Sequence, residues 1–167
     1  VGGPAIVVVE RDPPQQVISP EVADTVTTAL RGVVTGGTGT AAQLAGWDVA
    51  GKTGTTDDTR DAWFVGYTPD LLALVWVGYD DNAKTGLTGA SGALPIWVDF
   101  MMRSRPRWGV RGFAEPEGIQ HRVICEKTGL LATEACSNIR SEVFIEGTEP
   151  RRSCDRHGSG SLSAWVT

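Results

Sequence analysis

The 167-residue sequence predicts an α/β (α+β) fold in which helices cover both faces of an antiparallel sheet. Three features of the sequence support this prediction. A helix-spaced apolar segment lies before residue 36, and three strand-like segments follow one another between residues 47 and 79. The last of these segments, residues 71–79, is apolar at successive positions. Because such a strand carries apolar side chains on both sides of its pleat, we expect both faces of the sheet to be covered.

The first predicted elements are a strand and a helix. Residues 5–11 form a β-branched run followed by an aspartate and two prolines, which is typical of a strand that ends in a break. Residues 19–21 (Ser-Pro-Glu) form a helix start in which the serine is the N-cap and the proline takes the first helical position. The apolar residues that follow at helical spacing predict one buried helix face. They are Val22, Val26, Ala29, Leu30, Val33 and Val34.

The middle of the chain contains the predicted sheet. Strands are expected over residues 47–56, 62–67 and 71–79, and helices over residues 41–45 and 95–102. The linker between the last two strands, Thr68-Pro69-Asp70, is short enough for a hairpin. These two strands should therefore pair antiparallel.

The composition of the chain changes after residue 103. Residues 103–107 (R-S-R-P-R) form a basic, proline-broken junction, and all three cysteines lie beyond it. We therefore predict two units, with the sheet in residues 1–105 and a small, irregular, cysteine-containing extension in residues 106–167. The glycine- and serine-rich residues 158–163 are typical of a flexible tail.

The composition excludes some classes of function. The chain is 41% hydrophobic and 21% charged, as in an ordinary folded domain. Its net charge of −5 argues against a general basic surface, so no nucleic-acid partner is expected. No apolar run approaches the roughly 20 residues that span a bilayer. Because the chain opens on Val1 rather than methionine, we expect it to be a piece of a longer polypeptide, whose preceding part would hold any membrane anchor.

Two different chemistries fit the stretch around Lys52. Residues 46–53 (G-W-D-V-A-G-K-T) fit the phosphate-loop pattern G-x-x-x-x-G-K-[ST], which needs a strand before it and a helix that starts at the lysine. No apolar strand precedes Gly46, and the G-T-T-D-D-T that follows Thr53 is a poor helix start. The context therefore favours a strand, and nucleotide binding remains an alternative that nucleotide titration would test.

The second chemistry takes Lys52-Thr53-Gly54 as a triad on a strand that borders a cleft. A cation beside hydroxyls suits a substrate carboxylate, because it offers charge-assisted hydrogen bonds. Gly54 allows an extended peptide to approach the strand edge, and the amide of Thr55 is placed to donate to an oxyanion. The triad K-T-G is weak evidence by itself, since it recurs at residues 84–86 and 127–129. Both of those copies have the composition of turns.

The sequence on both sides of this triad makes the signal specific. The stretches that carry this signal are G-K-T-G-T-T-D-D-T-R-D-A-W-F-V-G-Y-T-P-D (51–70), V-W-V-G-Y-D-D (75–81), V-I-S-P-E-V-A (17–23), G-G-T-G-T-A-A (36–42), T-G-A-S-G-A-L-P-I-W (88–97), T-G-L-L-A-T-E-A-C (128–136) and F-I-E-G-T-E-P-R-R-S-C-D-R-H (144–157). Through them, nearly the whole chain from about residue 17 to residue 157 resembles the C-terminal half of the transpeptidase domain of bifunctional class A penicillin-binding proteins.

The resemblance implies a fold like that of the serine β-lactamases and penicillin-binding transpeptidases, and a role in cross-linking peptidoglycan. In that family a serine attacks the D-alanine carbonyl of a stem peptide, releases D-alanine and passes the acyl group to an amine. β-Lactams acylate the same serine. The implied partners are stem peptides, β-lactams, the remainder of the transpeptidase domain and an N-terminal glycosyltransferase domain, with no cofactor. The implied location is outside the cytoplasmic membrane.

The resemblance also implies roles for individual residues. Lys52 would support proton transfer, Thr53 would hold the substrate carboxylate, and Gly54 would border the bound peptide. Thr55 would supply the oxyanion amide and a second carboxylate contact. Three further matches, expected to be structural because buried aromatic residues usually pack, are Asp61, Trp63 and Phe64.

The sequence departs from the family in one respect. No serine is followed by a lysine three positions later, and there is no S-x-N triplet. Without a nucleophile, covalent catalysis has nothing to start it, so we expect the isolated chain to be inactive. A non-catalytic module that binds peptide or cell wall, with or without zinc, is the alternative. The upstream coding sequence would decide between them.

The cysteines allow two interpretations. Cys125, Cys136, Cys154 and His157 could form a Cys3His zinc site, but intervening stretches of ten and seventeen residues are unusual for a compact zinc finger. The extracytoplasmic location implied by the resemblance favours a disulfide between Cys136 and Cys154 and no metal. Cys125 lies in the apolar run V-I-C and is expected to be a buried thiol.

Overall fold

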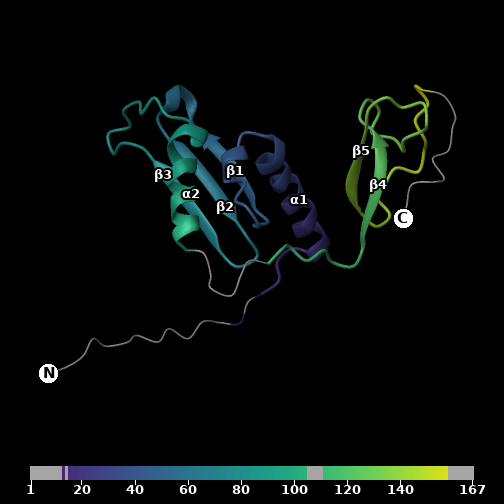
Figure 1. Ribbon diagram of the computed structural model, residues 1–167, viewed down its shortest axis with the longest axis horizontal. Helices are drawn as coiled ribbons and strands as arrows, with labels where there is room; N and C mark the ends of the chain where they lie inside the picture. The colour runs from purple at the N-terminus through teal and green to yellow at the C-terminus, as the bar shows by residue number, and fades with distance from the viewer. Residues whose placement is uncertain (1–12, 14, 105–110, 158–167) are drawn as a thin grey trace.

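The computed structural model describes residues 13, 15–104 and 111–157, and contains two separate antiparallel sheets (Figure 1). The predicted strand over 5–11, the predicted tail over 158–163 and the predicted boundary at residue 105 lie outside the described residues. The first sheet has three strands in the order β1-β2-β3, and the second has two, β4 and β5.

Helix α1 spans Pro20–Gly36 and begins as the sequence predicts. The Ser19 side chain accepts a hydrogen bond from the backbone N–H of Val22, at 3.3 Å. The predicted buried face is only partly confirmed. Val34 is buried, whereas Val22 and Val26 near the start of the helix are exposed. No helix within the described ranges is both long and apolar enough to cross a membrane.

The first sheet is formed by β1 (Ala50–Thr55), β2 (Ala62–Tyr67) and β3 (Leu72–Val77). The predicted hairpin between β2 and β3 is confirmed, with Ala62 opposite Val77 and Tyr67 opposite Leu72. Thr68 closes its turn, because its backbone N–H donates to the Leu71 carbonyl at 2.9 Å and its hydroxyl accepts from the Leu71 N–H at 3.2 Å. Short polar turns of this kind fix the register of the strands that they join.

One face of this sheet carries the core. Phe64 of β2 is fully buried and meets Trp97 edge to face, with ring centroids 5.1 Å apart. Trp97 lies on helix α2 (Leu94–Arg103), which confirms the helix predicted over 95–102. Its indole N–H donates to the carbonyls of Gly66 and Ala73, each at 3.2 Å. Val34 of α1 joins the same cluster, so both helices cover the Phe64 side.

The opposite face of the sheet is open in the described residues, which differs from the expectation of helices on both faces. The exposed fractions there are 63% for Leu72, 55% for Leu74, 43% for Trp76 and 37% for Trp63. Successive β3 residues alternate between faces, so Ala73, Val75 and Val77 pack on the core while the residues between them face away from it. The apolar run over residues 71–79 therefore supplies a second apolar face that no described element covers.

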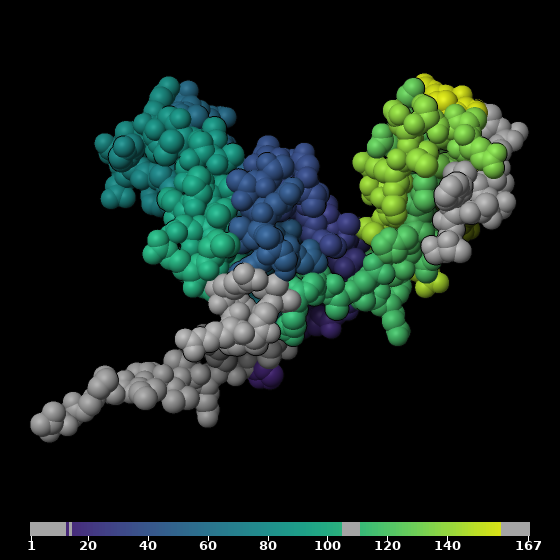
Figure 2. Space-filling model, in the orientation of Figure 1, coloured from purple at the N-terminus to yellow at the C-terminus, as the bar shows by residue number. Residues whose placement is uncertain are grey.

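The C-terminal extension is more regular than the sequence predicts. Strands β4 (Ile119–Cys125) and β5 (Ile139–Ile145) pair antiparallel along their whole length. This unit stands as a separate lobe beside α1, with β5 in contact with that helix (Figure 2). The segment that leads into it is anchored to the first sheet, because the Phe113 N–H donates to the Asp48 carboxylate at 3.1 Å and the Phe113 ring packs on Tyr67.

The tight contact between Gly66 and the core rings predicts a large effect of a single methyl group. A Cβ at Gly66 would lie 2.6 Å from Trp97 and 2.7 Å from Phe64, and neither buried ring has room to move. Gly66→Ala should therefore lower the free energy of unfolding by about 1–3 kcal/mol. The matched control is Gly32→Ala, because nothing lies within 4 Å of that position on α1. It should raise stability by about 0.5–1 kcal/mol. Urea denaturation measures both, and equal stabilities for the two variants would contradict this packing.

Candidate active site

The predicted site residues lie one after another on β1. Lys52, Thr53, Gly54 and Thr55 all belong to this strand, whose one edge pairs with β2. Within the described ranges no strand pairs with its other edge. A lysine in mid-strand does not fit a phosphate loop, in which the lysine starts a helix, so the nucleotide-binding alternative loses its structural basis.

The hydroxyl of Thr53 is held from outside the strand. Thr53 lies opposite Phe64, and its Oγ1 is 2.6 Å from the Oγ1 of Thr38 in the loop that follows α1. The exposed Lys52 ammonium donates to the Thr53 carbonyl at 2.7 Å. Two threonine hydroxyls therefore lie together beside the strand, and the Lys52 ammonium is hydrogen-bonded to the backbone of the same strand. Hydroxyls and a cation are donors that suit a carboxylate.

The hydroxyl of Thr55 is held by a second loop. The backbone N–H of Gly89, the first residue of the π-helical turn Gly89–Ala93, donates to Thr55 Oγ1 at 3.0 Å. Because this contact uses a lone pair of the oxygen, the hydroxyl proton remains free to donate to a ligand. A Cβ at Gly89 would lie 2.4 Å from the Trp63 carbonyl oxygen and 2.7 Å from that of Gly54. Glycine is therefore required for the turn to approach β1.

Gly54 has a packing reason as well as the predicted one. A Cβ at Gly54 would lie 3.1 Å from the Cβ of Trp63, its partner on β2. Trp63 itself packs on Trp76 of β3, with ring centroids 6.0 Å apart. A side chain at Gly54 would therefore disturb the exposed aromatic pair as well as fill the space beside the strand edge.

The turn between β1 and β2 is fixed by Asp61. Its carboxylate accepts from the Trp76 indole N–H at 2.9 Å and from the Thr56 hydroxyl at 3.1 Å. In return, the Asp61 N–H donates to Thr56 Oγ1 at 2.8 Å. These contacts agree with a structural role for Asp61, and the full burial of Phe64 agrees with the same role for that residue.

The other two K-T-G copies lie outside the strands, the first in a loop and the second in a turn, as their composition predicts. Lys84 of the first copy pairs with Asp58 at 3.1 Å, and Gly86 has a φ of 71°. In the second copy Gly129 has a φ of 69°, and its N–H donates to the Cys125 carbonyl at 2.8 Å. Only the copy at Lys52 lies on a strand.

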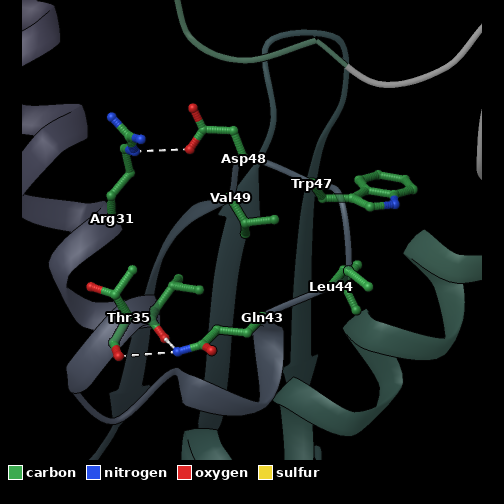
Figure 3. A pocket seen from close by; sticks show the side chains of 9 residues that line it. Arg31, Thr35, Gln43, Leu44, Trp47, Asp48 and Val49 are labelled. Carbon is green, nitrogen blue, oxygen red and sulfur yellow. Dashed lines mark hydrogen bonds and ion pairs between the residues drawn. The ribbon is translucent and has the colours of Figure 1, made fainter.

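A pocket of about 460 Å³ lies between α1 and the segment that leads into β1 (Figure 3). Its polar groups are engaged with one another. Arg31 pairs with Asp48 at 2.8 Å, and the Gln43 amide donates to the Val34 and Thr35 carbonyls at 2.8 and 3.0 Å. The pocket therefore lies between the end of α1 and the segment before β1, and Lys52 is not among the residues that line it.

The extension gathers the cysteines into one cluster. Cys125, Cys136, Cys154 and His157 each place one ligand atom within 4.8 Å of the other three. All three cysteines are free, so the structure lacks the expected Cys136–Cys154 disulfide. The Cys136 and Cys154 sulfurs nevertheless lie within 4.8 Å of each other, in a cluster that also holds Cys125 and His157.

The thiol of Cys154 is perturbed within this cluster. Burial raises its pKa, but hydrogen bonds from the Thr128 side chain and the Arg156 backbone outweigh burial and lower the pKa to about 6. Cys125 is fully buried, as predicted, although it lies beside His157 rather than alone, with its sulfur 3.5 Å from Nδ1.

Two residues beside the candidate site were not predicted from the sequence. Thr38 and Gly89 contact Thr53 and Thr55 from loops distant in sequence. Their signal was present, since they lie in the stretches G-G-T-G-T-A-A and T-G-A-S-G-A-L-P-I-W. Only the fold shows which threonine each stretch reaches.

Comparisons with known families and proteins agree with this arrangement. The family described as "Penicillin binding protein transpeptidase domain" matches residues 4–95, and the family described as "Penicillin-binding protein 1A, C-terminal domain" matches residues 115–159. Penicillin-binding protein 1A of Aquifex aeolicus is 44% identical over 128 residues, which are 75% of this chain and 17% of that protein. Penicillin-binding protein 1A of Vibrio cholerae is 37% identical over 143 residues, with the same two shares.

A solved structure agrees with the fold. The crystal structure of penicillin-binding protein 1A from Haemophilus influenzae superposes with a TM-score of 0.71 at 33% identity, over 82% of this chain and 22% of that one. The chain therefore spans about a fifth of the length of the proteins that it matches.

The position of Lys52 inside β1 predicts that the chain does not bind nucleotide. Titration with magnesium–ATP, followed by calorimetry, should give no saturable heat, because a strand lacks the helix N-terminus that holds the phosphates. Saturable binding that disappears in Lys52→Ala and survives in Lys84→Ala would contradict the strand assignment of the site.

Proposed function

Because this chain belongs to the penicillin-binding protein transpeptidase family, we propose that it supplies one wall of the acyl-transfer site of a peptidoglycan D,D-transpeptidase. One observation carries the proposal. The Lys52-Thr53-Gly54 triad lies on a strand with an unpaired outer edge in the described residues, and hydroxyls from Thr38 and Thr55 accompany it. A peptide that ends in a carboxylate is complementary to this edge.

The hydroxyls and the ammonium have different roles in the proposed site. Thr53 and Thr55 donate to the terminal carboxylate of a stem peptide, or to the carboxylate of a β-lactam. The Lys52 ammonium adds positive charge beside them and takes part in the proton transfer that activates the nucleophile. The two threonines are positioned before substrate arrives, since Thr38 and Gly89 already hold their oxygens.

The free edge of β1 binds the backbone of the substrate. An extended stem peptide lies along the free edge of β1, where Gly54 offers no side chain to obstruct it. The N–H of Thr55 donates to the oxyanion that forms when the D-alanine carbonyl is attacked. These assignments use the exposed side of a strand that is rigid through its pairing with β2.

The remainder of the transpeptidase domain completes the site. It covers the sheet face that exposes Leu74 and Trp76, because a face with such apolar side chains is typical of a surface that is buried in the complete protein. It also supplies the nucleophilic serine, its lysine and the S-x-N element, which this chain lacks. The chain alone is therefore inactive in acyl transfer.

The substrate sets the location of the complete protein. Peptidoglycan strands are cross-linked outside the cytoplasmic membrane, so this part of the protein acts on that side. A membrane anchor and a glycosyltransferase domain belong to the part of the polypeptide that precedes this sequence.

Labelling with a fluorescent penicillin tests the proposal. The chain alone should form no covalent adduct. A chimera in which this chain replaces the matching C-terminal part of the Aquifex aeolicus relative should be acylated. In that chimera Lys52→Ala should reduce the acylation rate by about 10²–10⁴-fold, because a group that acts in proton transfer is lost.

The other lysines provide matched controls. Lys84→Ala and Lys127→Ala remove the lysine from the two K-T-G copies outside the strands and should leave acylation unchanged. The thermal unfolding midpoint of each variant separates lost chemistry from lost folding. Equal loss of acylation in all three folded variants, or an adduct on the chain alone, would reject the proposal, and an inert but folded chimera would favour a non-catalytic binding module.

A further inference from the structure

The cysteine cluster of the C-terminal extension is the strongest feature that acyl transfer does not explain. Its four members are Cys125, Cys136, Cys154 and His157. Cys125 ends β4, Cys136 lies in the turn before β5, and the other two follow β5. They come together because the β4–β5 ladder places Cys125 opposite Ile139, and the Cys154 N–H donates to the Leu131 carbonyl at 2.8 Å.

The distances in this cluster fit a tetrahedral metal. With Zn–S of about 2.3 Å and Zn–N of about 2.0 Å, two ligand atoms of a tetrahedron lie about 3.8 Å apart for two sulfurs and about 3.5 Å apart for sulfur and nitrogen. The His157 Nδ1 lies 3.5 Å from the Cys125 sulfur and 3.2 Å from the Cys154 sulfur. All four ligand atoms lie within 4.8 Å of one another, so small side-chain movements bring them to the spacing of one tetrahedral ion.

The surroundings of the cluster suit a closed site. Cys125 and Cys154 are buried, and Cys136 and His157 are half-buried. The backbone N–H and the hydroxyl of Thr133 each lie 3.4 Å from the Cys136 sulfur. Hydrogen bonds of this kind orient metal ligands from the second layer around them.

A disulfide accounts for less of this arrangement. It would join two of the three sulfurs and leave the third, together with the His157 imidazole, without a role in the same small space. A four-coordinate ion uses every member. The ligand set of three cysteines and one histidine is a usual set for structural zinc.

We propose that Cys125, Cys136, Cys154 and His157 bind one structural Zn²⁺ ion, which closes the C-terminal extension. Because the protein provides four ligands, no coordination position is left for a substrate. The ion ties the end of β4 to the segment after β5, so it stabilises the extension rather than taking part in acyl transfer. Penicillin does not report on this site, and the proposal is therefore independent of the function proposed above.

The test is the metal content and the metal spectrum of the full chain. Purified under reducing conditions and dialysed against metal-free buffer, the chain should retain one zinc ion per molecule by elemental analysis. Replacement by Co²⁺ should give thiolate charge-transfer absorption and the visible bands of a tetrahedral site. X-ray absorption should show three Zn–S distances of about 2.3 Å and one Zn–N distance of about 2.0 Å.

Variants locate the ion, and the chain offers a matched control. His157→Ala and Cys125→Ser should lose zinc and lower the unfolding midpoint of the extension. His121→Ala should keep it, because His121 lies on β4 and contacts Glu115 at 2.6 Å, outside the cluster. The spectra of the unmutated protein remain decisive if a variant fails to fold.

Three results would overturn the proposal. The first is no zinc in the unmutated chain after refolding with Zn²⁺. The second is a Cys–Cys disulfide, detected by mass spectrometry without reductant, in protein that also lacks zinc. The third is zinc that persists in folded His157→Ala or Cys125→Ser, which would place the ion elsewhere.

Discussion

The contact between Trp97 and β2 is the interaction on which the candidate active site depends. The indole packs against Phe64, and its N–H donates to the carbonyls of Gly66 on β2 and Ala73 on β3. These contacts fix the position of α2 on the sheet. The turn that precedes α2 is thereby held against β1, where Gly89 donates to Thr55. A core contact far from Thr55 in sequence thus positions the turn that holds one hydroxyl of the candidate site, so overpacking at Gly66 would also disturb that hydroxyl.

Local chemistry explains what the sequence predicted well. Ser19 caps α1, Thr68 closes the hairpin, and β2 begins and ends where its pattern indicates, because each of these depends on residues close in the chain. Burial of whole faces was predicted less well. Val22, Val26 and Leu74 have the spacing of buried residues, yet they are exposed in the described part of the chain. Such a pattern is typical of surfaces that another part of a larger domain covers. The spacing of apolar residues does not identify the element that covers them.

The cysteine cluster was also predicted less well, because its members are distant in sequence. Ligand spacing along the sequence disfavoured a zinc site, since ten and seventeen residues separate the cysteines. Spacing is informative only where one turn supplies neighbouring ligands, as for Cys154 and His157. Cys125 and Cys136 meet these through the turn at Gly129, which the sequence indicated, and through the pairing of β4 with β5, which it did not. The K-T-G copy at residues 127–129 therefore has a structural role. The Gly129 N–H donates to the Cys125 carbonyl, and this turn reverses the direction of the chain after β4.

The two sites of the chain differ in completeness for a physical reason. The cysteine cluster draws all four of its ligand atoms from this chain, as a closed structural metal site does. The strand Lys52–Thr55 is instead open along one edge within the described residues, and in the proposed function a substrate peptide lies there. Its donors are nevertheless prearranged, since Thr38 and Gly89 hold the two threonine hydroxyls before any ligand binds. In the proposed function, the wall that excludes water and brings the nucleophile comes from outside this chain, and the exposed Trp63–Trp76 face offers a surface against which that wall can pack.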